Sequence, residues 1–490
     1  MYPRLVNFFR LFWLLLVAWY ELGTFYHHTA VCPWPDQLFI KPEDSPTHVL
    51  VVADPQILDM RSYPDRPPWL QTLTQLMVDL YIRKSWRAVL RRRPDAIVFL
   101  GDMMDNGRLA MSDQEYEAYV RRFRSIFAAD SSVPMHYLPG NHDIGLGVSS
   151  EKYRFDENAL QRYKSHFGPL NQRVSIANHT VWMIDAPGLV DEDRERLIAR
   201  KSFTEWAEAR PDRTIAFVQS YVQDSAVDRT GTILFTHVPL SRPEMSPCGP
   251  LREGRTLRQG RGLGYQNLLL PEASQFLLQS IRPSVVFSGD DHDYCEYEHT
   301  YTGSKLPAVP EITVKSFSMA MGIRKPGYQL LSLIPPKQYQ SGPSFAHQPC
   351  LLPNQLSIYL SVYVPFIVIT LLALLVSNFR RVSSPPRSVT SPTQDTVNFD
   401  LPPPSAWRTK GFPRQAWSKT WTIAIGGRPR NFTLSPAGFR RSIVAFFWTG
   451  GSRAPDSTRG GGVLVGFLKD FREAAWAPLA LFAGIAWWAW

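Results

Sequence analysis

The sequence predicts an α/β domain of layered sheets and helices, joined to apolar helices that cross a membrane. Two observations support this combination. Between residues 48 and 330, short runs rich in β-branched and other apolar residues alternate with helical patterns, which is typical of layered α/β domains. Further along, residues 356–377 contain no charged side chain over a length sufficient to span a bilayer.

Length and composition set the outer limits of this prediction. The chain has 490 residues, 44% of them hydrophobic, so it can form a large packed domain with additional segments. The formal net charge is +10, but much of the excess follows residue 378, beside the apolar stretch. The sequence shows neither a basic helix with interleaved aromatic residues nor a zinc-finger spacing, so we expect no nucleic-acid partner.

Three apolar segments predict where the chain meets the membrane. Residues 1–25 are interpreted as a signal anchor, because no small-residue cleavage site follows the apolar run. A cleaved signal peptide is the alternative. Residues 355–377 are predicted to be a transmembrane helix. Arginines follow it directly, so the positive-inside rule puts that end in the cytosol and residues 26–350 in the lumen. The third segment, 473–490, either spans the membrane or only anchors to it.

The segment between the last two apolar stretches has a different composition. Residues 378–465 are basic and rich in Ser, Pro, Gly and Thr, so they are predicted to be a largely disordered cytosolic tail. This topology makes a prediction about two N-glycosylation sequons. Asn178 lies in the predicted lumenal domain and Asn431 in the tail, so we expect only Asn178 to be modified.

Four cysteines permit up to two disulfides in an oxidising compartment, with three connectivities. They show no CxxC spacing, which argues against a zinc ribbon. Cys32 and Cys350 are a candidate pair because each lies next to an apolar segment.

The predicted domain core, residues 48–330, contains six candidate strands: 48–53, 96–100, 133–138, 181–184, 232–236 and 284–288. Helical patterns at residues 69–92 and 113–127 lie between some of them. Ligands of such sheets gather at the loops beyond the strand ends, so the polar residues there are candidate functional residues.

Five of these runs are followed by candidate metal ligands. The five are Asp54-Pro55-Gln56, Gly101-Asp102-Met103-Met104-Asp105, Gly140-Asn141-His142-Asp143, Thr236-His237 and Gly289-Asp290-Asp291-His292. Oxygen and imidazole donors without thiolates suit Mn, Fe or Zn. Two ions bridged by a carboxylate bind a phosphate and lower the pKa of a bound water, and a nearby histidine can protonate the leaving group or hold the phosphoryl oxygens.

The order and spacing of these loops resemble the calcineurin-like metallophosphoesterases over residues 48–330. The resemblance implies a double β-sandwich flanked by helices, with two divalent metal ions. Carried over by motif, it makes Asp102 the bridging ligand and His142 the catalytic histidine. The other implied metal ligands are Asp54 and His292 for one ion, and Asn141 and His237 for the other.

Two positions depart from the family pattern. Gln56 stands where the first motif has a histidine, and Asp290 stands where the last motif has its first histidine. Both are predicted metal ligands. Asp291 is the alternative to Asp290 as the metal ligand. The alternative role of Gln56 is a hydrogen bond to a bound water. Both changes replace nitrogen by oxygen, so Mn2+ is the expected metal. Asp105 and Arg108 are expected to shape their loop without touching metal.

The departures, together with the membrane segments, resemble the fungal enzymes of the endoplasmic reticulum that remodel GPI anchors. This resemblance implies removal of ethanolamine phosphate from a mannose of the anchor. The expected partners are then a GPI-anchored glycolipid or protein and the membrane, and the expected location is the endoplasmic reticulum membrane (or the Golgi), with the catalytic domain lumenal. The competing interpretations are a phosphatase acting on proteins or small phosphoesters, and a non-catalytic membrane adaptor for cargo sorting.

Overall fold

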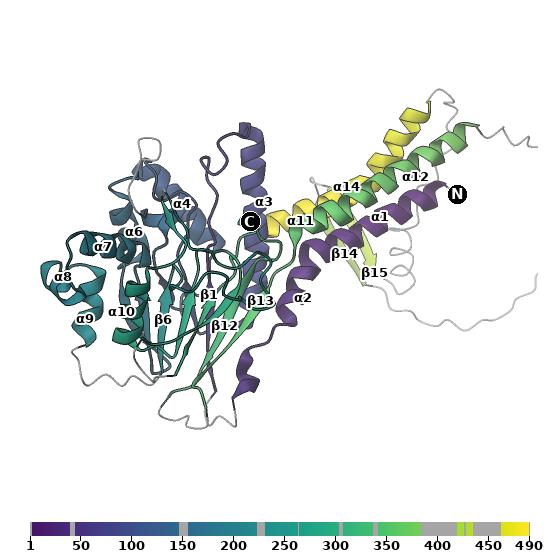
Figure 1. Ribbon diagram of the computed structural model, residues 1–490. Helices are drawn as coiled ribbons and strands as arrows, with labels where there is room; N and C mark the ends of the chain where they lie inside the picture. The colour runs from purple at the N-terminus through teal and green to yellow at the C-terminus, as the bar shows by residue number, and fades with distance from the viewer. Residues whose placement is uncertain are drawn as a thin grey trace, which may run out of the picture. The chain divides into compact units, whose positions relative to one another are not determined.

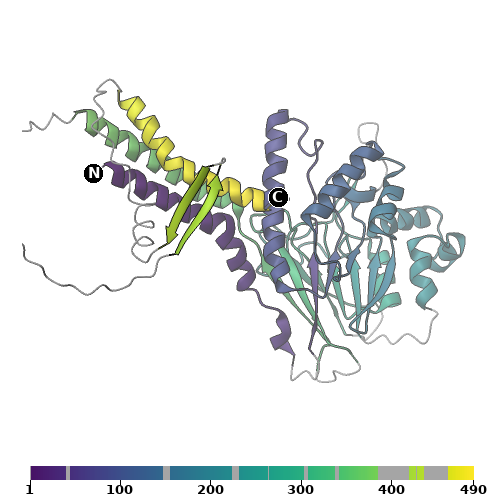
Figure 2. The same ribbon diagram turned by 180° about the vertical axis from the view of Figure 1, so that it is seen from behind.

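The computed structural model describes residues 2–39, 45–146, 155–222, 231–262, 264–302, 307–336, 342–383, 419–425, 428–434 and 462–489. The chain divides into two compact units. The smaller unit comprises Met1–Val17 and Val364–Leu481, and the larger one comprises Ala18–Tyr363 and Phe482–Trp490. Figures 1 and 2 show the two units from opposite sides, and each is described by itself.

Two β-sheets form the centre of the larger unit. The first has the order β13-β12-β1-β2-β3 and the second β10-β11-β9-β6-β5-β4. The strands of the first sheet are β1 (Thr47–Val52), β2 (Ala96–Phe99), β3 (Met135–Tyr137), β12 (Gly327–Leu333) and β13 (Phe345–Leu351). Those of the second are β4 (Gln172–Ile176), β5 (His179–Ile184), β6 (Thr232–Thr236), β9 (Val285–Ser288), β10 (Cys295–His299) and β11 (Val309–Thr313). A small hairpin, β7 (Arg261–Gly262) with β8 (Tyr265–Gln266), stands apart from both.

The alternation of side chains along β1 shows how the layers are built. Val49 and Val51 pack into an apolar cluster that also contains Met183 and Phe235 of the second sheet. Leu50 of the same strand points the opposite way, into a cluster formed with helices. Both faces of β1 are therefore buried over residues 49–52, which explains why this part of the strand is continuously apolar.

Helices cover the outer faces of the two sheets, as Figure 1 shows for α7 to α10 on one side of the unit. One outer cluster joins the first sheet to α3 and α4, and another joins the second sheet to α7, α9 and α10. The helices of this unit are α2 (Thr24–Ala30), α3 (Pro68–Val89), α4 (Asp113–Ile126), α5 (Asn141–Ile144), α6 (Ala159–Phe167), α7 (Ala186–Ile198), α8 (Phe203–Ala209), α9 (Thr214–Val222), α10 (Pro271–Ile281) and α11 (Gln355–Ile358). Short 3-10 or π-helical turns are Trp19–Gly23, Pro35–Leu38, Leu90–Arg92 and Tyr359–Tyr363. The fold is thus two packed sheets flanked by helices.

α4 illustrates how local sequence determines an element. Ser112 caps its start by accepting a hydrogen bond from the backbone N–H of Glu115. Its buried residues Tyr116, Val120 and Phe123 recur at helical spacing and face the core.

The predicted strands and helices are confirmed with shifts of one or a few residues at their ends. β4 and β10 to β13 were missed. β10 and β13 mix polar and apolar residues, and residues of both remain partly exposed. The first sheet also continues past residue 330, because β13 pairs with β12 as its outer strand.

Two disulfides link distant parts of the larger unit. Cys32 is bonded to Cys350, which confirms the candidate pair, and Cys248 is bonded to Cys295. The first connects the segment after α2 to β13. The second connects the loop after β6 to the start of β10.

Three helices pack together in the smaller unit. They are the parts of α1 (Tyr2–Ala18), α12 (Val364–Ser383) and α14 (Val463–Ala489) that fall within this unit. Arg10 donates to the carbonyl of Glu473, and the Asn378 amide donates to Asp470 at 2.9 Å. Polar contacts therefore join α14 to both of the other helices.

Within the described part of the chain, two segments are long and apolar enough to cross a membrane by length and composition. They are Arg4–Leu38, which overlaps the predicted segment 1–25, and Gln355–Val382, which contains the predicted segment 355–377. α14 begins at Val463, before the predicted third segment, and its first half is charged.

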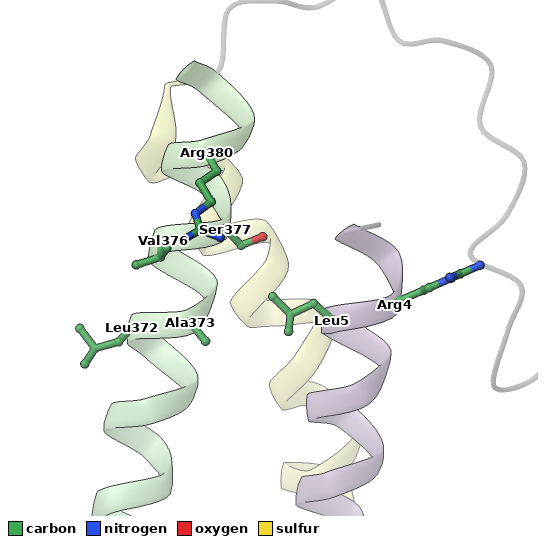
Figure 3. Close-up of a pocket in the computed structure, with 7 residues that line it drawn as sticks. All are labelled: Arg4, Leu5, Leu372, Ala373, Val376, Ser377 and Arg380. Carbon is green, nitrogen blue, oxygen red and sulfur yellow. The ribbon is translucent and has the colours of Figure 1, made fainter. Parts of the chain in front are cut away.

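A cavity of about 640 Å3 lies between α1 and α12, lined by Arg4, Leu5, Leu372, Ala373, Val376, Ser377 and Arg380. Figure 3 shows Leu5 extending from α1 toward α12, whereas the Arg4 side chain extends away from α12. Arg4 and Arg380 line the same cavity, so the arginine-bearing ends of the two helices are neighbours.

Most of the predicted disordered tail, residues 378–465, lies outside the described residues. Inside that range, α12 continues to Ser383, and β14 (Lys419–Ile425) pairs with β15 (Arg428–Leu434) in an antiparallel hairpin.

Candidate metal centre

The ends of parallel strands bring the predicted site residues together. β1, β2 and β3 run parallel, as do β6 and β9 in the other sheet. Each is followed directly by one of the five polar loops. Several contacts join the two sheets at this edge, and two of them involve the first and last loops or a backbone carbonyl. The His237 ring lies 2.7 Å from the Leu100 carbonyl, and the Asp290 N–H donates to Asp54 Oδ1 at 3.1 Å.

The predicted ligands form one buried cluster. Donor atoms of Asp54, Asp102 and His292 all lie within 4.8 Å of one another, as metal ligands do. His237 Nε2 lies 3.0 Å from Asn141 Oδ1 and 3.4 Å from Asp102 Oδ1. Asp102 therefore lies between the two groups, where a bridging ligand is expected.

Gln56 and Asp290, the two departures from the family pattern, also lie in this cluster. Gln56 Nε2 donates to Asp102 Oδ2 at 2.7 Å and lies 3.2 Å from His292 Nε2. Asp290 Oδ1 lies 3.5 Å from His237 Nε2. Its competitor Asp291 instead pairs with Arg252. The structure thus brings Asp290, and not Asp291, next to the other candidate ligands.

Backbone carbonyls fix the tautomers of both site histidines. A carbonyl oxygen only accepts hydrogen bonds, so the ring nitrogen facing it must carry the proton. His237 Nδ1 faces the carbonyl of Leu100, and His142 Nδ1 faces that of Asp105. In the neutral rings Nε2 is then the unprotonated atom, able to bind a metal in His237 and to exchange a proton in His142.

His142 is placed to meet a substrate. Its side chain is 24% exposed, whereas those of Asp54, Asp102 and His237 are almost fully buried. Its backbone N–H donates to Asp102 Oδ1 at 2.8 Å, which ties it to the centre of the cluster. The structure therefore gives His142 a different environment from the candidate ligands.

The backbone of the cluster is strained. Five candidate ligands have positive φ angles although none is glycine: Asp54 (47°), Gln56 (35°), Asp102 (54°), Asp290 (64°) and His292 (66°). Non-glycine residues rarely adopt this region, and such strain concentrates at functional sites.

Two glycines allow the loops to approach one another. A Cβ on Gly101 would lie 2.5 Å from His237 Nδ1, and one on Gly140 would lie 2.0 Å from Asp102 Oδ1. Both distances are far shorter than van der Waals contact. The glycines of the two motifs are therefore steric requirements of the cluster.

Burial and neighbouring charges shift the acidities in the cluster. Burial raises the pKa of Asp54 well above its ordinary value, and Asp102 and Asp290 add to this against the opposing effect of His237. Burial acts in the same direction on Asp102, but the imidazoles of His237 and His142 bring its pKa below the ordinary value. Burial would lower the pKa of His237, yet Asp102 and its other acidic neighbours raise it well above the ordinary value.

The side chains of the cluster have the donor atoms and burial expected of a site for divalent metal ions. Asp54 Oδ2 is buried and has no hydrogen-bond partner among the described residues, which is costly unless a cation binds it. Burial lowers the pKa of His292, so its ring is neutral and able to bind a metal. Carboxylate, amide and imidazole donors are the set preferred by Mn, Fe and Zn.

Asp105 and Arg108 lie beside the cluster. The Asp105 carboxylate lies 3.6 Å from His142 Nδ1, and Arg108 Nη1 donates to the Asn141 carbonyl at 3.1 Å. The loop-shaping role expected for both agrees with these contacts.

Sequence reasoning missed the contribution of Gly264. Its carbonyl accepts hydrogen bonds from Asn141 Nδ2 at 2.9 Å and from Arg108 Nη1 at 3.1 Å. These bonds leave Asn141 Oδ1 facing His237. The partner is a backbone atom, so no side-chain pattern could have revealed it.

Sequence reasoning also missed a buried glutamate that supports the Asp290 and His237 loops. Glu311 of β11 is fully buried and accepts hydrogen bonds from Arg242, His299 and Ser288 and from the Leu240 N–H. Ser288 and Leu240 border the Asp290 and His237 loops. Glu311 therefore fixes both loops against the sheet.

A buried cluster of carboxylate, amide and imidazole donors beside a partly exposed histidine indicates a metal-dependent hydrolase centre suited to phosphoric esters. Residues 47–294 match the family described as calcineurin-like phosphoesterase. The chain belongs to this family of metal-dependent phosphoesterases.

Individual relatives agree with this membership. The chain is 36% identical over 341 residues to Cell division control protein 1 of Saccharomyces cerevisiae, covering 68% of this chain and 65% of that protein. It is 28% identical over 255 residues to Metallophosphoesterase 1 of Mus musculus, covering 48% and 60%. The matches thus span less than two thirds of either relative. A dimetal phosphatase from Danio rerio aligns over 59% of this chain and 96% of its own, with 15% identity and a TM-score of 0.33.

Proposed function

We propose that this protein is a two-metal phosphodiesterase of the endoplasmic reticulum membrane that removes ethanolamine phosphate from a mannose of GPI anchors. The observation that carries the proposal is the buried cluster around Asp102, with the partly exposed His142 beside it. The apolar helices support a membrane-bound substrate, because they would hold the site close to a lipid.

The candidate ligands divide into two groups around Asp102. Asp54, Gln56 and His292 would hold one ion, and Asn141, His237 and Asp290 the other, with Asp102 shared. Mn2+ is the expected metal, since oxygen donors occupy two positions where the family has nitrogen. Bound ions would lower the pKa of an attacking water and neutralise charge on the phosphoryl oxygens.

His142 is the residue proposed to exchange a proton with the substrate. Its Nδ1–H is held by the Asp105 carbonyl, so Nε2 is the ring atom that gains and loses the transferred proton. A protonated Nε2 can donate to the leaving oxygen or hold a phosphoryl oxygen. Nothing in this role needs His142 to bind metal.

The first experiment measures substrate choice directly. The full-length protein in detergent with Mn2+ should release ethanolamine phosphate from a GPI intermediate, detected by mass spectrometry, faster than it releases phosphate from a phosphopeptide. His142→Ala should lower this release by about 100-fold or more while metal content stays at the wild-type value. Faster turnover of the phosphopeptide would support a protein phosphatase. No turnover of either, with transport restored in a null strain by His142→Ala, would support a non-catalytic adaptor.

The location proposal rests on the larger unit. Its two disulfides favour an oxidising compartment. Asn178 is exposed at the tip of the β4–β5 hairpin, where an attached glycan would meet solvent. We therefore propose that this unit lies in the lumen.

Asn178→Asp tests the lumenal placement. Asn178 has φ of 60°, a conformation that aspartate also tolerates, so the hairpin should keep its structure. The protein expressed in eukaryotic cells should show an endoglycosidase-sensitive shift on gels that this variant loses. A shift lost instead in Asn431→Gln would place the tail in the lumen and reverse the topology.

A further inference from the structure

The segment after β6, residues 241–262 and 264–267, contacts loops of the metal centre at both of its ends, and we call it the site wall. One end of it is attached to the Asp290–His292 loop. Cys248 is bonded to Cys295, and Arg252 pairs with Asp291. The Asp293 carboxylate accepts hydrogen bonds from the backbone N–H groups of Glu253 and Gly254 at 2.8 and 2.7 Å.

The other end of the site wall is attached to the Asn141 loop. The Gly264 carbonyl accepts hydrogen bonds from Asn141 Nδ2 and Arg108 Nη1. The hairpin of β7 and β8 runs directly into this contact. Two attachments, at Gly254 and Gly264, thus hold the residues between them at the edge of the metal centre.

Three arginines lie between these attachments. Arg255, Arg258 and Arg261 are all exposed. Two other arginines of the site wall, Arg242 and Arg252, are paired with carboxylates. For the three exposed ones, no ion pair with a carboxylate is found among the described residues. The site wall therefore presents positive charge that the protein's described part does not neutralise.

We propose that Arg255, Arg258 and Arg261 bind a second anionic group of the substrate, a phosphate other than the one cleaved at the metal centre. This rests on the proposed phosphodiesterase function and deepens it. The substrate class is a phosphodiester that carries at least one further phosphate. Arginine suits this task because its guanidinium matches phosphate oxygens with paired N–H donors.

The site wall also explains why such a phosphate would be bound close to the reaction. Gly264 orients Asn141, a candidate ligand, and lies three residues after Arg261 in the same hairpin. The exposed arginines thus lie in the same segment that orients a candidate ligand of the metal centre. Exposed charges act over about 10 Å at moderate salt, so they attract an anion before it reaches the metals.

A matched pair of substrates tests the proposal. Thymidine 5′-(p-nitrophenyl) phosphate carries one phosphodiester, and its 3′-phosphorylated counterpart adds a single phosphate. We expect the full-length wild type to have kcat/KM about tenfold or more higher for the 3′-phosphorylated substrate, with the preference falling as salt rises. The variant Arg255→Gln/Arg258→Gln/Arg261→Gln should bring the ratio of the two kcat/KM values to about one.

A control variant removes the same charge elsewhere. Arg121, Arg210 and Arg282 are exposed residues of α4, the end of α8 and the end of α10. Replacing all three by glutamine should leave the wild-type ratio in place. An equal loss in this control would show a general effect of net charge and would overturn the proposal.

Binding separates this proposal from the proposed function. By calorimetry, thymidine 3′,5′-bisphosphate should bind wild type more tightly than thymidine 5′-monophosphate, and the site-wall variant should lose that difference. If neither diester is hydrolysed but the binding difference appears and is lost as expected, the phosphodiesterase function fails while the anion site stands. Equal binding of the two nucleotides by wild type overturns the anion site.

Discussion

Replacing Asp102 by asparagine is expected to remove at least one metal ion and to lower phosphodiester hydrolysis by more than about 100-fold. Asp102 Oδ1 accepts from the His142 N–H and Oδ2 accepts from Gln56 Nε2, so each oxygen faces a donor. The N–H groups of an asparagine amide would face one of these donors, and two donors cannot hydrogen-bond to each other. It would also lose the charge that a bridging ligand shares between two cations.

Elemental analysis of the purified variant and hydrolysis of bis(p-nitrophenyl) phosphate check this prediction. Asp291→Asn is the matched control for metal content, since Asp291 pairs with Arg252 and lies outside the cluster. We expect this control to keep both ions. An Asp102→Asn protein with wild-type metal content and hydrolysis would show that Asp102 is not the shared ligand.

Gly140→Ala is the second change with a large expected effect. The added methyl group would lie 2.0 Å from Asp102 Oδ1 and 2.4 Å from the Asp102 backbone nitrogen. Neither partner can yield without displacing the Asp102 loop. The Asn141–His142 turn must therefore move away, and we expect hydrolysis to fall by about 100-fold or more, with lower metal content and with unfolding free energy reduced by roughly 1–3 kcal/mol.

Gly254→Ala separates this steric effect from a general intolerance of the site to alanine. A Cβ on Gly254 meets only Asp293 Oδ2 at 3.4 Å, an ordinary contact, and the donating N–H is retained. We expect near wild-type metal content and thermal stability for this control. Gly140→Ala behaving like Gly254→Ala would mean that the two loops are not in close contact in solution.

Much of the fold follows from local patterns. Every side chain of β2, β6 and β9 is buried, as are residues 49–52 of β1, so the apolar pattern of these runs predicts strands without knowledge of their neighbours. β13 was not predicted, because it is an outer strand of the sheet with partly exposed residues and a mixed sequence. A strand of this kind is identified only when its neighbour is known.

The candidate site was likewise predicted in part from local sequence, and in part it depends on the tertiary structure. The polar loops after predicted strands, together with their resemblance to the family's motifs, indicated the seven candidate ligands and His142. The preference for Asp290 over Asp291 came from alignment to a motif. In the structure the distinction is spatial, since Asp290 faces His237 and Asp291 faces Arg252.

The sequence by itself determined the class of chemistry, the order of the ligand-bearing loops and the apolar segments. Only the tertiary structure decided that carbonyls of Leu100 and Asp105 fix the two histidine tautomers, and that Gly264 orients Asn141. It also decided which residues take strained positive φ angles. The physical reason is that side-chain identity is written in the sequence, whereas a backbone atom acquires a role only when the fold brings a distant residue within hydrogen-bond distance of it.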